Sequence, residues 1–372
     1  MRSIYDAIVV GGGVIGGSIA YHLAKRGKQV LLLEKDRLAC QASSAAAGML
    51  GAQAELSASN PLLPLAKKSR EMFPTLSAEL KEFSGIDIEF INKGLLKVAL
   101  TNEQETELKN LINSQSWTGE EEWLSTTEIK KIEPLISDDI RGAMYIPRDG
   151  QVSPYHLSIA FAKSAAMLGA EIKEFIQVRD LLFEDNRVKG VYTNEGEFFS
   201  ENVIVASGTW SKFLLEKVGV KIDTYPIKGE CFSIMTHRPL LEKTIFSHGC
   251  YLVPKIGGRI IVGATEKPHT FDQRVSIDGI SALMEKAKRL LPAIKDTEFE
   301  RAWAGLRPQT GDGLPYIDEH PEFHGLFIAT GHYRNGILLS PITGQIVADL
   351  VERNASSECT AFRVDRTYQI NY

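Results

Sequence analysis

The sequence GGGVIGGSIA, which begins at Gly11, is the feature that most restricts how this chain can fold. Gly11, Gly13 and Gly16 fit the spacing G-x-G-x-x-G. The apolar residues before this stretch are typical of a buried strand, and those after it are spaced like one face of a helix. In such a unit the first glycine permits a tight turn, the second lets a pyrophosphate approach the backbone, and the third lets the helix pack closely on the strand. The stretch therefore predicts a helix N-terminus that faces a phosphate group.

A second predicted strand, QVLLLE, supports this interpretation because it ends in Glu34. A carboxylate at this place can accept hydrogen bonds from the hydroxyl groups of a ribose. The two segments together predict a dinucleotide-binding unit rather than a glycine-rich turn of some other α/β protein. These residues alone do not distinguish NAD from FAD.

The composition, with 44% apolar and 24% charged residues in 372, is that of an ordinary globular protein of about two domains. The net charge of −5 and the lack of a basic block argue against nucleic acid or an anionic membrane as a partner. No apolar run approaches the roughly 20 residues that span a bilayer. Because a strand is predicted so close to Met1, we expect no signal peptide. The four cysteines lie far apart, so we expect neither a metal site nor a disulfide framework. We expect a soluble, cytoplasmic protein.

The middle of the chain continues the nucleotide-binding pattern in an unusual way. Ser153 and Pro154 begin a helical pattern, which is followed by a strand, a small β-meander and the apolar strand NVIVAS. A meander thus replaces the usual crossover helix of the second half of the domain. NAD-dependent Rossmann domains usually continue β-α-β instead.

The remaining segments predict a second, mostly antiparallel domain. Residues 221–301 alternate like strands around one amphipathic helix, residues 85–100 alternate around a turn at 92–94, and residues 101–137 are charged and helical in spacing. The last segment predicts a strand, a glycine turn and a helix whose N-terminus returns toward the cofactor. We therefore expect a discontinuous nucleotide-binding domain and a substrate domain. Their expected boundaries are 1–82, 148–222 and 302–372 for the first, and 83–147 and 223–301 for the second.

Several strings resemble the D-amino-acid oxidase family of FAD enzymes, namely SSAAAGML, SGTWS, WAGLRPQTGDGLPYI and ATGHYRNGILLSPITG. Within that family the chain is similar to the branch that oxidises glycine in the bacterial thiamine pathway, and the similarity extends over nearly the whole chain. The resemblance implies an α/β FAD-binding (glutathione-reductase-like Rossmann) domain with a second, mostly antiparallel α+β substrate domain. The opening turn would then hold the pyrophosphate of non-covalently bound FAD.

The resemblance also implies which positions contact FAD, mostly through backbone atoms. The pyrophosphate would be held by Gly11, Gly13, Val14, Ile15 and Gly16, and the adenosine ribose by Glu34 and Lys35. The ribityl chain and the flavin would lie along Ala42, Ser43, Ala47, Gly48 and Met49, and the adenine would contact Val178. The pyrimidine edge of the flavin would be held by His332, Tyr333, Arg334, Asn335, Gly336, Ile337 and Leu338.

For the substrate, the family pattern points to Tyr251, Arg307 and Arg334 as the catalytic set, with Met49 and Gly51 beside them. A planar guanidinium binds a carboxylate through two hydrogen bonds and would fix the α-carbon of a small amino acid over flavin N5. Hydride would then pass to the flavin, so no side chain need act as an acid or base. The alternative for Arg307 is a structural role in a turn, for Arg334 a place on the surface, and for Tyr251 a place in the core.

Glu266 departs from the family pattern, in which this position near the substrate tends to be apolar. We therefore count it among the substrate-binding candidates. Its carboxylate could favour a bulkier or cationic amine, or it could face solvent. Gly249, beside Cys250 and Tyr251, would leave the entrance of the site open.

The implied activity is oxidation of glycine, sarcosine or a small D-amino acid by O₂, which gives glyoxylate, ammonia or an amine, and H₂O₂. The resemblance also implies a role in thiazole and thiamine biosynthesis, a thiazole synthase as partner and a homotetramer. Alternatives are an oxidase of sarcosine or N-methyl amino acids, an FAD dehydrogenase with an acceptor other than O₂, and a non-catalytic flavoprotein. Residues 300–325 contain no cysteine for covalent flavin, which argues against the branch of sarcosine oxidases that carry one. The paired arginines argue against a purely structural FAD.

Overall fold

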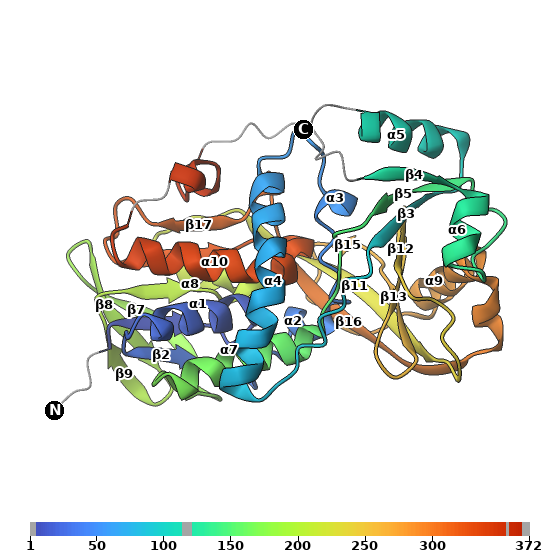
Figure 1. The fold of residues 1–372 in the computed structure, drawn as a ribbon. Helices are drawn as coiled ribbons and strands as arrows, with labels where there is room; N and C mark the ends of the chain where they lie inside the picture. The colour runs from blue at the N-terminus through green and yellow to red at the C-terminus, as the bar shows by residue number, and fades with distance from the viewer. Residues whose placement is uncertain (1–4, 114–120, 355–356, 367–372) are drawn as a thin grey trace.

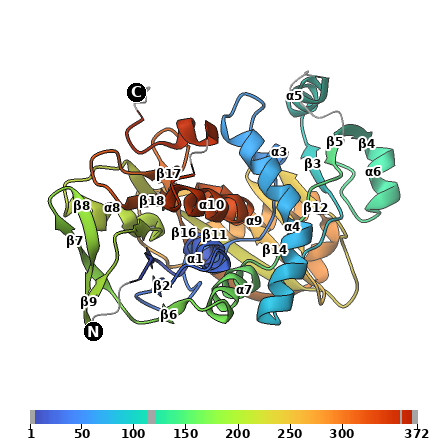
Figure 2. The ribbon, with the colours of Figure 1, turned by 60° about the vertical axis from the view of Figure 1, so that its left-hand side comes forward.

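The computed structural model describes residues 5–113, 121–354 and 357–366. Two lobes lie side by side, and the long helix α4 (Leu62–Ser84) stands between them (Figure 1). One lobe is built on a six-stranded sheet and the other on a nine-stranded sheet. The view in Figure 2 shows the same separation, with β7, β8 and β9 at the opposite end of the molecule from α5 and α6.

The six-stranded sheet has the strand before the glycine turn near its centre. This strand, β1, pairs in parallel with β2 on one side and with β10 on the other. The order across the sheet is β17, β18, β10, β1, β2 and β6, and β17 is antiparallel to its neighbour. The strands are β1 Ala7–Val10, β2 Val30–Leu33, β6 Glu171–Lys173, β10 Val203–Val205, β17 Tyr316–Glu319 and β18 Leu326–Thr330.

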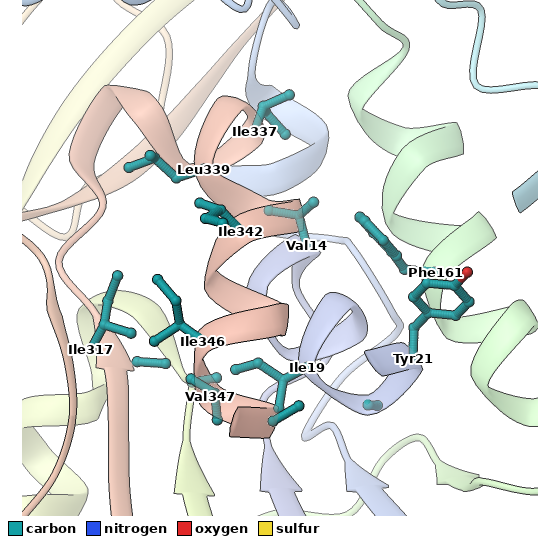
Figure 3. Close-up of a cluster of buried hydrophobic side chains, with 14 of the residues drawn as sticks. Val14, Ile19, Tyr21, Phe161, Ile317, Ile337, Leu339, Ile342, Ile346 and Val347 are labelled. Carbon is teal, nitrogen blue, oxygen red and sulfur yellow. The ribbon is translucent and has the colours of Figure 1, made fainter. Parts of the chain in front are cut away.

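Both faces of this sheet are covered, which is why the inner strands β1, β2 and β10 are apolar at every position rather than at alternate ones. Val9 and Leu32 belong to the core on one face, and Ile8 and Leu31 to the core on the other. Helices cover the first face, and Figure 3 shows their side chains meeting there, with Ile19 beside Ile346 and Val347. These helices are α1 Val14–Lys25, α4, α7 Pro154–Met167 and α10 Gly336–Val351.

The predicted meander is confirmed, and it lies over the second face of the six-stranded sheet together with α8 (Ser211–Glu216). Val191 and Leu181 from the meander pack in the same core as Leu215 from α8. The meander consists of β7 Val178–Glu184, β8 Arg187–Thr193 and β9 Gly196–Phe199.

The nine-stranded sheet contains the predicted alternating segments. Its longest strands, β11 and β16, pair antiparallel from Thr224 opposite Thr310 to Met235 opposite Glu298. Helix α9 (Ile277–Leu290) packs its apolar face on this sheet, as predicted. The strands are β3 Leu95–Ala99, β4 Glu122–Ser125, β5 Gly142–Ile146, β11 Thr224–Met235, β12 Thr244–Ser247, β13 Cys250–Pro254, β14 Arg259–Gly263, β15 Lys267–Pro268 and β16 Glu298–Thr310.

Two local predictions are wrong. Residues 85–94 form no strand of a hairpin, because Gly85 ends α4 in a left-handed conformation and only Ile91 makes an isolated bridge, to Gln151. Residues 101–137 are not helical throughout. The structure has α5 (Asn102–Asn113), the strand β4 and α6 (Thr126–Ile132) there, and β4 exists because it pairs with β5.

Within the described ranges, no helix is both long and apolar enough to cross a membrane. The same ranges contain no group of three or more His, Cys, Asp or Glu side chains that could hold a metal ion. Cys40 is exposed, while Cys231 and Cys250 are buried, and all three are free thiols.

Candidate active site

A cavity of about 370 Å³ lies where the two sheets meet. The carboxyl ends of four strands of the six-stranded sheet open into it, through Val10, Leu33, Ala206 and Thr330. Its opposite wall is formed by residues of β11, β13 and β16 from the other sheet. Ligands of open α/β sheets bind at the carboxyl ends of the strands, so this is the expected place for a functional site.

The glycine turn forms one end of the cavity with the geometry that its sequence predicts. Helix α1 starts at Val14, and its first turns carry no acidic side chain that would oppose an anion. Gly11 has φ +113, and a Cβ there would lie 2.6 Å from the carbonyl oxygen of Ala206. A Cβ at Gly16 would collide with the carbonyl oxygen of Gly11. Each glycine is therefore required, the first by the turn and the second by the packing of α1.

Glu34 is buried beside the glycine turn and stabilises it through hydrogen bonds. Its carboxylate accepts hydrogen bonds from the backbone N–H of Gly12 (2.6 Å) and of Asp36 (2.9 Å). The next residue, Lys35, places its Nζ 4.1 Å from the centre of the Trp210 ring, in a cation–π contact. Lys35, Trp210 and Val178 all line the cavity at this end.

The small-residue segment between residues 42 and 49 runs along the cavity wall. It includes the short helix α2 (Ala42–Ala45), and Ser43 Oγ accepts a hydrogen bond from the N–H of Val14 at 2.9 Å. Gly48 has φ +89, and a Cβ there would collide with the carbonyl oxygen of Val152. Small residues therefore allow this backbone to lie between the cavity and the β5–α7 connection.

The predicted glycine turn before the last helix closes another side of the cavity. His332 is buried, and its Nε2 lies 3.1 Å from Thr343 Oγ1. Burial lowers the pKa of His332 to about 3, so its imidazole is neutral near neutral pH. Tyr333 follows in a short 3-10 helix, and Gly336 begins α10.

Arg307 lies at the end of the cavity that the nine-stranded sheet forms. It sits on β16 opposite Ile227, and its Nη1 donates a hydrogen bond to the carbonyl oxygen of Thr265 at 3.3 Å. In the part of the chain that the structure describes, it forms no ion pair with a carboxylate; its guanidinium lies over Gly229 and against the carbonyl oxygen of Thr265. Its charge is therefore available to an anionic ligand.

Tyr251 and Cys231 lie beside Arg307, with the Tyr251 hydroxyl 3.5 Å from the Cys231 sulfur. Burial raises the pKa of Tyr251 well above its usual value, and it also raises the pKa of Cys231. Both groups are therefore protonated near neutral pH. Tyr251 can donate a hydrogen bond into the cavity but cannot serve as a base there.

Arg334 is engaged by two carboxylates. Its Nε and Nη2 donate to Glu55 at 2.7 Å and 3.1 Å, and its Nη1 forms an ion pair with Glu266. Burial acts to lower the pKa of Arg334, but the adjacent charge of Glu55 outweighs this and raises it above its usual value. Arg334 thus holds a bidentate partner on one edge and a second carboxylate on the other.

A second cavity of about 380 Å³ adjoins the first. The two cavities share Glu55, Tyr333 and Arg334, and Glu266 lines the second one. The side chain of Glu266 is 46% exposed, compared with 11% for Glu55. The carboxylate of Glu266 therefore faces both Arg334 and solvent.

Most of the predicted site residues line the first cavity. They are Gly11, Gly13, Val14, Ile15, Glu34, Lys35, Ala42, Ser43, Ala47, Gly48, Met49, Val178, Tyr251, Arg307, His332, Tyr333, Arg334, Gly336 and Ile337.

Five predicted site residues lie outside that lining, each for a local reason. Gly16 packs on the turn and Leu338 is in the core between helices, where its carbonyl accepts a hydrogen bond from Ser69. The N–H of Asn335 donates to His332 within the turn, and the N–H of Gly51 donates to the buried Asp149. Glu266 belongs to the second cavity.

Several lining residues have no counterpart among the predicted ones. Glu55 approaches Arg334 from α3 (Ala52–Glu55), although 279 positions separate the two in the chain. Glycines 229 and 305, which face one another across β11 and β16, also line the cavity. Their signal in the sequence is a glycine within a strand, which marks the close approach of another group. Trp210 and Cys231 are two further examples of unpredicted lining residues.

Comparison with known proteins identifies relatives over nearly the whole length of the chain. The family model described as "DAO: FAD dependent oxidoreductase" matches residues 6–350. The glycine oxidase of Geobacillus kaustophilus (strain HTA426) is 49% identical over 360 residues, which cover 96% of this chain and 95% of that protein. The crystal structure of glycine oxidase from Geobacillus kaustophilus superposes with a TM-score of 0.95 at 47% identity, covering 98% of this chain and 100% of that one.

A fusion protein is also similar. The bifunctional protein ThiO/ThiG of Synechocystis sp. is 34% identical over 358 residues, which are 94% of this chain and 52% of that protein. The chain described above therefore corresponds to about half of the fusion.

Proposed function

This chain belongs to the DAO family of FAD-dependent oxidoreductases, and we propose that it oxidises glycine, and also sarcosine and small D-amino acids. The immediate product would be the imino acid, which water converts to glyoxylate and ammonia or an amine. O₂ would receive the electrons and become H₂O₂. The similarity to glycine oxidases over 96–98% of the chain supports this proposal.

FAD is the cofactor of the family, and the first cavity fits it. The turn at Gly11 leaves no room for side chains where a pyrophosphate would approach, and α1 points its N-terminus there. Val14, Ile15, Glu34, Lys35 and the 42–49 segment would hold the nucleotide and the ribityl chain, and residues 332–337 would hold the flavin edge. Bound FAD supplies a two-electron acceptor, which no amino-acid side chain provides.

The observation that carries the proposal is the position of Arg307. It lines the same cavity as the glycine turn, at the opposite end, and it lacks a carboxylate partner among the described residues. A substrate carboxylate would supply that partner through two hydrogen bonds, and the hydroxyl of Tyr251, which lines the same cavity, would add a third. Because Arg334 is held by Glu55 and Glu266, Arg307 would make the principal contact with the carboxylate.

The residues of the cavity provide orientation rather than proton transfer. His332 is neutral because of burial, Tyr251 keeps its proton, and Arg307 and Arg334 remain charged. The substrate amine would therefore lose its proton to solvent before oxidation, and the reactive species is the neutral amine. Met49 and Tyr333 line the cavity and reduce the access of water to the α-carbon.

We propose the discontinuous domains described above for this architecture. The six-stranded sheet takes its strands from residues 7–33, 171–205 and 316–330, which supports the first domain. β16 begins at Glu298, so it crosses the proposed boundary at residue 302 while it pairs with β11.

The relatives also support proposals about the pathway and the partner of this chain. The similarity to ThiO/ThiG supports a role in thiamine biosynthesis with a thiazole synthase as partner. We further propose a cytoplasmic homotetramer with non-covalently bound FAD. Gel filtration with light scattering tests the assembly, since a monomer or dimer would contradict it.

The proposed activity is tested by adding glycine to the holoenzyme without oxygen. Bleaching of the flavin absorbance is expected with glycine, sarcosine and D-alanine, and readmission of air should restore it with formation of H₂O₂. Failure of all three to bleach the flavin would contradict the proposal. Bleaching without H₂O₂ upon aeration would identify a dehydrogenase with another acceptor.

A further inference from the structure

Gly229 is a glycine within the long strand β11, and its φ angle lies outside the left-handed region. The backbone at this position therefore accepts any side chain. A glycine within a strand weakens it, so its presence indicates the close approach of another group. That group is the guanidinium of Arg307, which reaches across from the neighbouring strand β16.

The guanidinium of Arg307 occupies the space over Gly229. A Cβ at Gly229 would lie within 3.0 Å of Nη1, Cζ and Nη2 of Arg307, a separation that real Cβ atoms essentially never show. These three guanidinium atoms are also its three nearest neighbours. An alanine here would thus displace the end of a flexible side chain and leave the backbone where it is.

The charged neighbours of Gly229 are engaged elsewhere. Lys228 and Glu230 form a buried ion pair at 3.0 Å, and Glu230 also accepts hydrogen bonds from the N–H and hydroxyl of Ser276. The guanidinium of Arg307 is therefore positioned by two features: the bare backbone of Gly229, and the carbonyl oxygen of Thr265.

We propose that Gly229 is a positioning residue for substrate binding, because it provides the flat surface on which the guanidinium of Arg307 lies in its carboxylate-binding orientation. This inference rests on the proposed function, since it assigns the carboxylate of the substrate to Arg307. A methyl group at Gly229 shifts the guanidinium by about 1 Å to reach ordinary contact at 3.4 Å or more. A displacement of that size in a positioning group can cost on the order of a hundredfold.

The experiment measures the binding of glycolate, a carboxylate that has no amine to oxidise, to the FAD-loaded Gly229→Ala variant. Glycolate is titrated while the visible absorbance of the flavin is followed. We expect binding at least about tenfold weaker than in the native protein, with FAD retention and thermal stability unchanged. Gly17→Ala is the matched control, because a Cβ there meets only ordinary contacts at 3.4 Å or more, and it should leave glycolate binding unchanged.

A double-mutant cycle with Arg307→Lys separates the positioning role from direct obstruction of the ligand. Lysine keeps the positive charge but lacks the planar group that Gly229 accommodates. We expect Gly229→Ala to weaken binding by less than about twofold when Lys is present at 307. An equal loss in both backgrounds would overturn the proposal, because the methyl group would then act on glycolate itself.

Two further results of the glycolate titration would each decide against a positioning role for Gly229. Native affinity in the Gly229→Ala variant would overturn the proposal, and so would failure of the native holoenzyme to bind glycolate. Neither result affects the proposed function, which fails only if glycine, sarcosine and D-alanine all leave the flavin oxidised.

Discussion

Replacement of Glu266 by methionine tests whether this carboxylate competes with the substrate for Arg334. Glu266 forms an ion pair with Arg334 Nη1, on the guanidinium edge that Glu55 leaves open. The Glu266→Met substitution removes this carboxylate and puts an apolar side chain in its place. A substrate carboxylate would then approach Arg334 without displacing Glu266.

The size of the effect follows from exposure. The side chain of Glu266 is 46% exposed and that of Arg334 is 23% exposed, so solvent screens much of their attraction. Ion pairs of this kind contribute about 0–1 kcal/mol, and the upper value corresponds to roughly a fivefold change in affinity. We therefore expect the KM for glycine to fall about two- to fivefold, with little change in kcat, because binding improves equally in the ground and transition states.

Steady-state oxygen consumption with glycine, sarcosine and D-alanine provides the assay. Glu107→Met is the matched control, since Glu107 lines the same second cavity but no contact joins it to Arg334 in the described structure. A KM for glycine that is unchanged or higher in Glu266→Met would refute the reasoning. It would mean that Glu266 does not compete with the substrate.

Four other predictions follow from the site and the core. Arg307→Ala should retain FAD and raise the KM for glycine over a hundredfold, because leaving a buried charge unpaired costs about 3–5 kcal/mol; normal glycine kinetics would assign Arg307 a structural role. The value of kcat/KM for glycine should rise with pH through the mildly alkaline range, since no cavity side chain serves as a base; a flat profile would reveal a missed base. Acid precipitation should release the FAD into the supernatant, and colour that stays with the protein would indicate a covalent bond. His22→Gln should make the free energy of unfolding, measured with urea, less sensitive to acid. Burial lowers the pKa of His22 to about 3, so the unfolded chain binds more protons as the pH falls and the native protein loses about 1.6 kcal/mol of stability between pH 6.5 and 5. Equal pH slopes for variant and native protein would contradict this.

The nucleotide-binding half was predictable because its signals are local. The glycine spacing, the apolar strands and the helix starts each depend on neighbours along the chain, and β1, α1 and α10 form where the pattern predicts. β4 was missed because its four residues, Glu-Trp-Leu-Ser, do not alternate between apolar and polar and none of them is fully buried. Their extended conformation comes from pairing with β5, which no local pattern reveals.

The candidate site was predictable to a similar extent and for the same reason. The backbone positions around the turns follow from glycines, whereas the electrostatics of Arg334 depend on Glu55, which lies 279 positions away. Nothing in the residues around Glu55 indicates that its carboxylate meets an arginine. The fold alone brings this pair together, and with it the distinction between an engaged Arg334 and an available Arg307.

The boundary between the two cavities is made of charged and aromatic side chains, because Glu55, Tyr333 and Arg334 line both. The position of such a boundary changes when one or two of its side chains are substituted. A boundary formed by main chain would move only if the fold itself changed. The range of amines that the enzyme accepts is therefore an evolvable property. A duplicated copy of this gene could come to accept larger substrates through single-codon changes at Glu55, Tyr333 or Arg334. The part of the first cavity that would hold the flavin would stay unchanged.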